Sequence, residues 1–154
     1  MPATFAAVFI ALYIAHAVGD HWVQTSHQAG TKGGAGWSAR RACGWHVLTL
    51  TLTKALVLAV VALVLDLRLA APGLLIGLGL DAASHYWADR RFTLARLAAR
   101  LRIDDFYRLG TAAHPHHPVT ADGAPALTLG TGAYQLDQSW HLLWLGIAAL
   151  IITV

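Results

Sequence analysis

The chain has little of what soluble or disulfide-bonded proteins depend on. Only 12% of its 154 residues are charged, whereas about 25% is usual in soluble domains. Its single cysteine, Cys43, excludes an intramolecular disulfide and any cysteine-based metal motif. The sequence also has no phosphate-binding P-loop, no dinucleotide-binding glycine motif and no nucleophile elbow. These absences exclude several common classes of soluble enzyme.

What the chain does have is apolar sequence in long runs. Hydrophobic residues make up 56% of it, and the mean hydropathy is +0.53. So short a chain cannot bury this much apolar surface in a water-facing fold, so lipid must cover part of it. Met1 is followed by no basic segment and no cleavage site, so the first run is predicted to be retained. We predict an all-α, integral membrane four-helix bundle in a single domain, 1–154, with spans at 4–22, 45–65, 73–88 and 136–154.

The basic residues indicate how these spans are oriented. Of the eleven Lys and Arg residues, Arg68 lies in the short turn and Lys54 lies inside a span. The other nine lie in the two long connections: Lys32, Arg40, Arg41, Arg90, Arg91, Arg96, Arg100, Arg102 and Arg108. The positive-inside rule predicts a multi-pass protein of the cytoplasmic membrane, with both long connections in the cytoplasm and both termini outside.

Segment 92–103 alternates leucine and arginine at helical spacing, which predicts an interfacial amphipathic helix in the long third connection. Anionic lipid suits it better than nucleic acid, although the net charge is +3. We find no DNA-reading motif and predict no nucleic-acid partner.

Polar residues recur inside the spans at one spacing. His16 and Asp20 are four residues apart, as are Asp81 and His85, and Asp137 and His141, and the second span begins at His46. A spacing of four places both side chains on one helix face. At about 1.5 Å per residue, all of them lie within roughly 12 Å of the predicted cytoplasmic boundary. Their common depth predicts one site.

Imidazole and carboxylate groups in an apolar environment suggest a divalent metal, because ionised carboxylates there need pairing or coordination. This donor set suits zinc, iron or manganese, as one or two ions. We predict His16, Asp20, His46, Asp81, His85, Asp137 and His141 as ligands, with an uncoordinated Asp20 or Asp137 as the catalytic base. The predicted surrounding residues are Tyr13, Gln24, Thr49, Lys54, Asp89 and Gln138.

Several of these residues have simpler explanations. A lone intramembrane histidine is more often a hydrogen-bond partner between helices than a ligand. Thr49 can bond its own backbone, Asp89 can pair with the adjacent arginines, and Lys54 can be a counter-ion for a site aspartate. The tract containing His114, His116 and His117 resembles a chelating sequence, and its role is left open.

The segments HAVGDHWVQT (16–25), DAASHYWADRR (81–91) and GAYQLDQSWH (132–141), together with His46, resemble one family. It is the domain of unknown function 3307, a family of small bacterial membrane proteins with actinobacterial members. The resemblance covers nearly the whole chain and implies a multi-helix fold in the bacterial inner membrane. A more loosely similar group is described as membrane-bound metal-dependent hydrolases.

The leading hypothesis is a membrane-embedded metal-dependent hydrolase, for which the basic loops favour an anionic, lipid-like substrate. A second hypothesis is a non-catalytic protein that binds or moves metal ions or protons, although the outer halves of the spans offer no polar path. A third is a structural or interaction module with a metal-free His–Asp network. An oxygen-activating di-iron enzyme and a homo-oligomer also remain open.

Overall fold

The computed structural model describes residues 2–110 and 131–154, which are helical and contain no strand. The all-α prediction is therefore confirmed. Four helices are long: α1 (Pro2–Val18), α3 (Gly36–Val64), α4 (Ala71–Asp89) and α7 (Gly132–Thr153). The shorter elements are the π-helical turn η1 (Gly19–Val23), α2 (Ser26–Thr31), α5 (Phe92–Arg100) and α6 (Asp104–Arg108).

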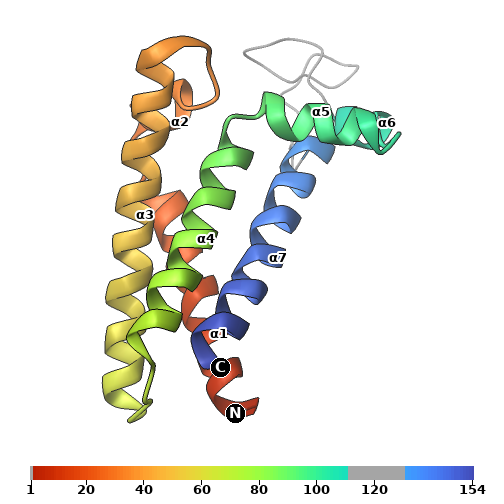
Figure 1. Cartoon of the computed structure of the whole chain (residues 1–154). Coiled ribbons are helices and arrows are strands. Elements are labelled where there is room, and N and C mark those ends of the chain that lie inside the picture. Colours follow the sequence, from red (N-terminus) through yellow and green to blue (C-terminus); the bar gives the residue numbers. More distant parts are fainter. Residues whose placement is uncertain (1, 111–130) are drawn as a thin grey trace, which may run out of the picture.

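The four long helices lie side by side (Figure 1). Helix α1 contacts α3 and α7, and α4 contacts the same two helices from the other side. Both chain ends lie at one end of the molecule, which we call the terminal end, and α2, α5 and α6 lie at the opposite, loop end (Figure 1). The chain has four long helices, the same number as the predicted spans, so it returns to the end of the molecule where it began.

Small residues bring the helices close together toward the terminal end. A Cβ atom on Gly73 would lie 2.9 Å from the backbone oxygen of Ile151, and one on Gly77 would lie 2.7 Å from Ile152 Cγ1. These glycines let the α4 backbone approach α7 more closely than any side chain would allow. The core here is apolar, built from Val8, Ala11, Leu12, Leu58, Leu145, Ala148, Ala149 and Ile152.

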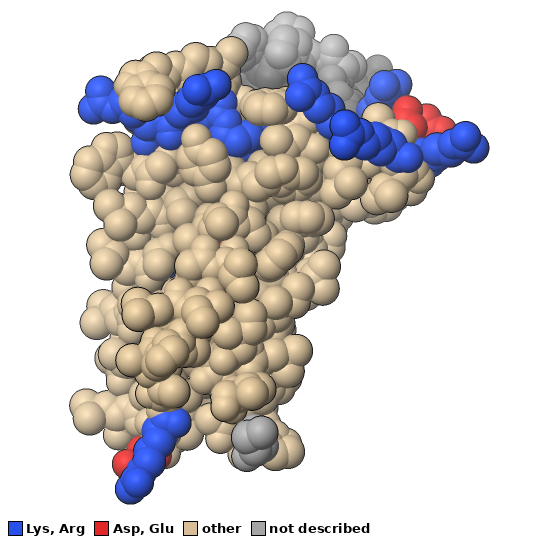
Figure 2. All heavy atoms as spheres, viewed as in Figure 1, with Lys and Arg blue, Asp and Glu red and all other residues tan. Residues whose placement is uncertain are grey.

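Three segments are long and apolar enough to cross a membrane: Pro2–Val23, Gly36–Val64 and Gly132–Thr153. Helix α4, which contains the predicted third span, is not among them, because Asp81, His85 and Asp89 lower its hydropathy. On the face shown in Figure 2, Lys and Arg side chains gather at the loop end, one basic side chain lies beside an acidic one at the far tip, and no Lys or Arg is visible between. The protein thus has the pattern of a membrane protein.

The helix limits differ from the predicted spans in one main place. Helix α3 begins at Gly36 rather than at residue 45, and its 29 residues make it about 43 Å long. Its first turns bury Ala39, Ala42 and Cys43, and this burial stabilises helix in a segment that was predicted to be loop. The same predicted loop contains α2, which starts with a capping box between Thr25 and Gln28.

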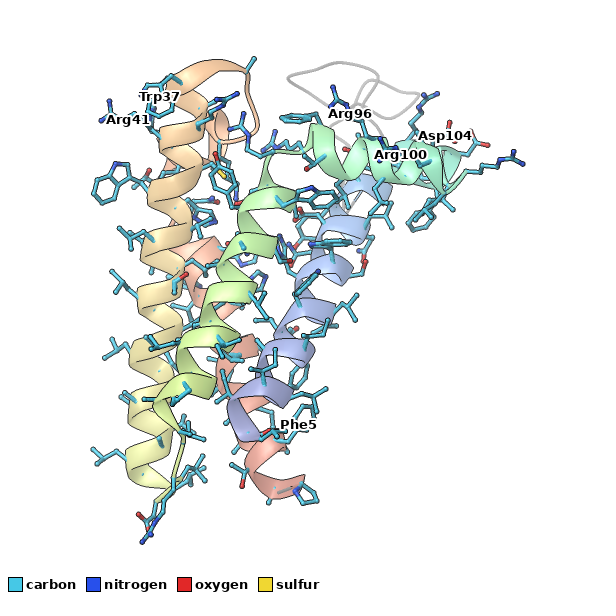
Figure 3. The ribbon with its side chains drawn as sticks, viewed as in Figure 1. Phe5, Trp37, Arg41, Arg96, Arg100 and Asp104 are labelled. Atoms are coloured by element: carbon cyan, nitrogen blue, oxygen red, sulfur yellow. The ribbon has the colours of Figure 1, made fainter. Side chains whose placement is uncertain are left out.

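The predicted amphipathic helix is present as α5, which ends at Arg100 rather than at residue 103. It buries Leu94 and Ala98 and crosses the loop end at a steep angle to the long helices (Figure 1). Arg96 and Arg100 extend from its outer side (Figure 3).

Candidate metal centre

Four histidines meet near the loop end, one from each long helix. They are His16 of α1, His46 of α3, His85 of α4 and His141 of α7, and none is more than 4% exposed. The ring centroids of His85 and His141 are 4.0 Å apart, those of His16 and His141 5.1 Å, and those of His46 and His85 5.2 Å. The structure therefore brings together all four histidines that the sequence placed at one depth.

Two carboxylates complete an inner cluster with two of these rings. Asp20 Oδ1 lies 3.1 Å from His46 Nε2 and 3.7 Å from His85 Nε2. Asp89 Oδ2 lies 3.3 Å from His46 Nε2 and 3.2 Å from His85 Nε2. The two Nε2 atoms are themselves 3.2 Å apart. We call Asp20, His46, His85 and Asp89 the inner cluster.

The π-helical turn η1 positions Asp20 in this cluster. Where it begins, a Cβ atom on Gly19 would lie 2.2 Å from Leu50 Cδ1, so only glycine lets the chain approach α3 this closely. π-turns inside helices often occur at functional sites. Asp20 stays near His16, with Asp20 Oδ2 3.5 Å from His16 Nε2, and also reaches His46 on the neighbouring helix.

Gln24 fixes the proton position on His46. In the amide orientation that satisfies its polar atoms, its side-chain oxygen accepts hydrogen bonds from His46 Nδ1 (3.2 Å) and Lys32 Nζ (2.7 Å). These partners assign the proton of a neutral His46 to Nδ1 and leave a lone pair on Nε2. That lone pair faces the carboxylate oxygens of Asp20 and Asp89. Such a group of electron-rich atoms is stable only with positive charge among them.

Further polar atoms around the inner cluster lack partners. Among the described residues, both ring nitrogens of His16, Nδ1 of His85 and Nε2 of His141 are buried without a hydrogen bond. Buried polar atoms are normally satisfied, so such exceptions call for a ligand, an ion or water. Two sets have ligand atoms within 4.8 Å of one another: Asp20, His46 and His85, and His85, Asp89 and His141. They share His85 and are positioned to hold one ion or two.

Two lysines balance part of the negative charge. Lys54 Nζ lies 2.5 Å from Asp81 Oδ2, with both side chains buried. Lys32 Nζ lies 2.9 Å from Asp89 Oδ2. Asp81 was predicted as a ligand, but it pairs with Lys54 and belongs to neither set of ligand atoms. Asp89 was predicted only as a surrounding residue, but it belongs to the set with His85 and His141. Lys32 was missed as a site residue, because nothing in a glycine-rich loop indicated its contact with Asp89.

The other predicted residues take varied places. Asp137 Oδ1 lies 3.5 Å from His141 Nε2, and Gln138 Nε2 donates to Asp137 Oδ2 at 3.3 Å, but Asp137 is 27% exposed and outside both sets. Thr49 donates to the backbone oxygens of Trp45 and His46, the simpler of its two interpretations. The tract 114–117 lies outside the described residues.

The cluster borders two hollows. The first, which we call the polar pocket, has a volume of about 530 Å³ and is lined by residues including Asp20, Gln24, Lys32, Asp89, Arg91 and Asp137. The second, which we call the lateral opening, has a volume of about 210 Å³ and lies between α1 and α7. Its lining includes Tyr13 and His16 of α1 and Gln138 and Leu142 of α7. Gln138 lines both hollows, and Tyr13 is 52% exposed.

The site therefore combines buried nitrogen donors with carboxylates that reach a pocket, and this donor set suits a divalent ion such as zinc, iron or manganese. No family model, curated protein or solved structure matches the chain. The resemblance to the domain of unknown function 3307 stays a prediction from the sequence, and the interpretation of the site rests on its geometry.

Proposed function

We propose that the protein is a membrane-embedded metal-dependent hydrolase whose centre opens to the cytoplasmic face. The observation that carries this proposal is the inner cluster, where His46 Nε2 lies 3.1 Å and 3.3 Å from two carboxylate oxygens and only 3.2 Å from His85 Nε2. A divalent cation among these atoms removes their mutual repulsion, and zinc suits the nitrogen and oxygen donors. His16 and His141, with free buried nitrogens beside the cluster, complete the ligand set.

In this proposal α4 also crosses the membrane, as the third of four spans along the chain. Its polar residues Asp81, His85 and Asp89 are buried, whereas Leu75, Ile76 and Leu80 are exposed on its outside. An outward apolar surface is what lipid requires, and inward ionisable groups mark function in membrane proteins. The positive loop end then lies in the cytoplasm, with both termini outside (Figure 2).

Hydrolysis is favoured over transport because neither hollow provides a polar path from the site through to the terminal end. The polar pocket reaches the centre from the loop end, where Asp20 and Asp89 line it. Toward the terminal end, beyond the buried pair of Lys54 and Asp81, the buried residues that the structure describes are apolar and so provide no ion path. A bound divalent ion lowers the pKa of its water. Asp137, partly exposed and in the pocket, can accept a proton as general base.

The proposal is tested by metal analysis of protein purified in mild detergent without a polyhistidine tag. Wild type is compared with His85→Ala, with His85→Gln as a polar alternative, and with His27→Ala as the control, since His27 is exposed outside the cluster. We expect about one or two equivalents of zinc, iron or manganese in wild type and His27→Ala, and loss in both His85 variants.

The result that would overturn the proposal is wild type without metal after reconstitution, or His85 variants that keep it. The cluster would then be a structural His–Asp network. Size-exclusion profiles of each variant separate loss of metal from loss of fold.

A further inference from the structure

Two cationic side chains border the carboxylates in the polar pocket. Lys32 is buried and held by Asp89 and by the Gln24 oxygen. Arg91 is exposed, and its Nη2 atom donates to the backbone oxygen of Ala29 at 3.2 Å. A guanidinium carries five N–H donors, so this single contact leaves a planar set available to another oxygen ligand. Arginine presents such donors in the geometry that phosphate oxygens accept.

The backbone holds Arg91 at this place. Its φ of 56° and ψ of −53° are rare for a residue with a side chain. A Cβ atom on Gly33 would lie 2.5 Å from Arg91 Cδ, so the arginine stem covers this glycine closely. The neighbouring Arg90 is buried and donates to the backbone oxygens of Lys32 (2.8 Å) and Gly34 (2.5 Å). Arg90 thus fixes the loop, and Arg91 faces the pocket.

The lateral opening lies next to this pocket, on the side of the helices between α1 and α7. Gln138 lines both hollows, and His16 lines the opening next to the inner cluster. Its lining changes from Gln135 and Ser139 to Leu142 and Leu145 along α7, toward the terminal end. Helix α1, which forms one side of the opening, also carries exposed Ile10 and Ile14. A ligand that fills both hollows has an anionic polar head and an apolar chain.

We infer that the substrate is a phosphate-ester lipid, whose phosphate binds beside Arg91 and Lys32 and whose chain leaves between α1 and α7. This inference rests on the proposed function. In the hydrolysis, a water oxygen bonds to phosphorus, the bond from phosphorus to the lipid oxygen breaks, and that oxygen takes the proton that the water releases. The products are the lipid alcohol and the phosphate.

The test measures binding rather than turnover. Full-length protein in mixed micelles receives phosphatidic acid, and native mass spectrometry counts the retained lipid against phosphatidylcholine. Arg91→Gln removes the phosphate contact, and Leu142→Trp fills the lateral opening. The matched controls are Arg41→Gln and Leu52→Trp, because Arg41 extends outward from α3 (Figure 3) and Leu52 is exposed outside both hollows.

We expect wild type to retain one phosphatidic acid, and each pocket variant to weaken binding by about tenfold or more, as loss of a charged hydrogen bond or of chain access predicts. The controls should match wild type. Equal losses in Arg91→Gln and Arg41→Gln would overturn the inference, because general surface charge would then explain the binding. Binding of glycerol 3-phosphate as tight as that of phosphatidic acid, unaffected by Leu142→Trp, would also overturn it and indicate a soluble phosphate ester.

Metal content measured on the same samples separates the two proposals. A wild type that holds metal but does not prefer phosphatidic acid refutes the lipid substrate and leaves the metal centre. A wild type without metal refutes the proposed function, whatever lipid it retains.

Discussion

The ion pair between Lys54 and Asp81 allows a sharp test of how this protein is held together. The lysine side chain is 0% exposed and the aspartate side chain 3%, and their charged atoms are 2.5 Å apart. Lys54 belongs to α3 and Asp81 to α4, so the pair links two helices. We predict that Asp81→Asn destabilises the protein strongly, because it leaves a buried ammonium group without its counter-ion.

The expected magnitude follows from the burial. Removing one partner of a buried ion pair costs about 3–5 kcal/mol, whereas replacing both partners by apolar groups is often neutral or stabilising. Lys54→Met should therefore cost a similar amount to Asp81→Asn, and Lys54→Met with Asp81→Leu should restore most of the stability. The double-mutant cycle should therefore give a coupling free energy of roughly 5 kcal/mol or more, because the costs of both single variants largely disappear in the double variant.

The assay is unfolding by SDS in mixed micelles, followed by tryptophan fluorescence, with metal content measured on each variant. Lys54→Met with Asp81→Leu should keep the wild-type metal stoichiometry, since Asp81 lies in neither ligand set. A cost below about 1 kcal/mol for both single variants, the range of exposed ion pairs, would refute the reasoning. Loss of metal in the stable double variant would return Asp81 to the ligand set.

Three further predictions follow from other contacts. Gln24→Ala should weaken metal binding by about 10–100-fold in chelator competition, because Gln24 orients His46; a change below about twofold would exclude that role. Gly77→Ala should destabilise the protein by about 1–3 kcal/mol and lower its melting temperature, because the added Cβ would lie 3.0 Å from the Ala148 backbone oxygen. Gly79→Ala on the same helix is the control: its Cβ would meet open space, so the melting temperature should stay unchanged. Removing the metal with a chelator should lower the free energy of unfolding by about 2.7 kcal/mol, relative to protein in free metal at 100 times its dissociation constant. An unchanged melting temperature in a thermal scan would contradict this.

The sequence predicted the histidines well because helical periodicity and depth are both readable from it. His16 and His85 each have an aspartate four residues away, and the spans set their level along the helices. The structure brings these residues together with His46 and His141.

The choice between Asp81 and Asp89 could not be made this way. Both are four residues from His85, on the same face of α4. What separates them is which cation each meets: Lys54 contacts Asp81 from α3, and Lys32 contacts Asp89 from the end of α2. Such pairings depend on how the helices and the loop pack, and a single sequence carries no measure of that packing.

The start of α3 was missed for a related reason. The glycine residues around Gly36 and the polar character of the segment favoured a loop, because glycine is a poor helix former. Burial of Ala39 and Cys43 against the neighbouring segments outweighs that preference.

The four-histidine centre also has a consequence for how the chain matures. Each long helix contributes one ring, and α7, which carries His141, leaves the ribosome after the other three. A nascent chain that stops short of α7 cannot assemble the complete set of donors, because metal sites rarely exist before folding. Under the proposed function, ion loading would therefore require that α7 has packed against the other long helices.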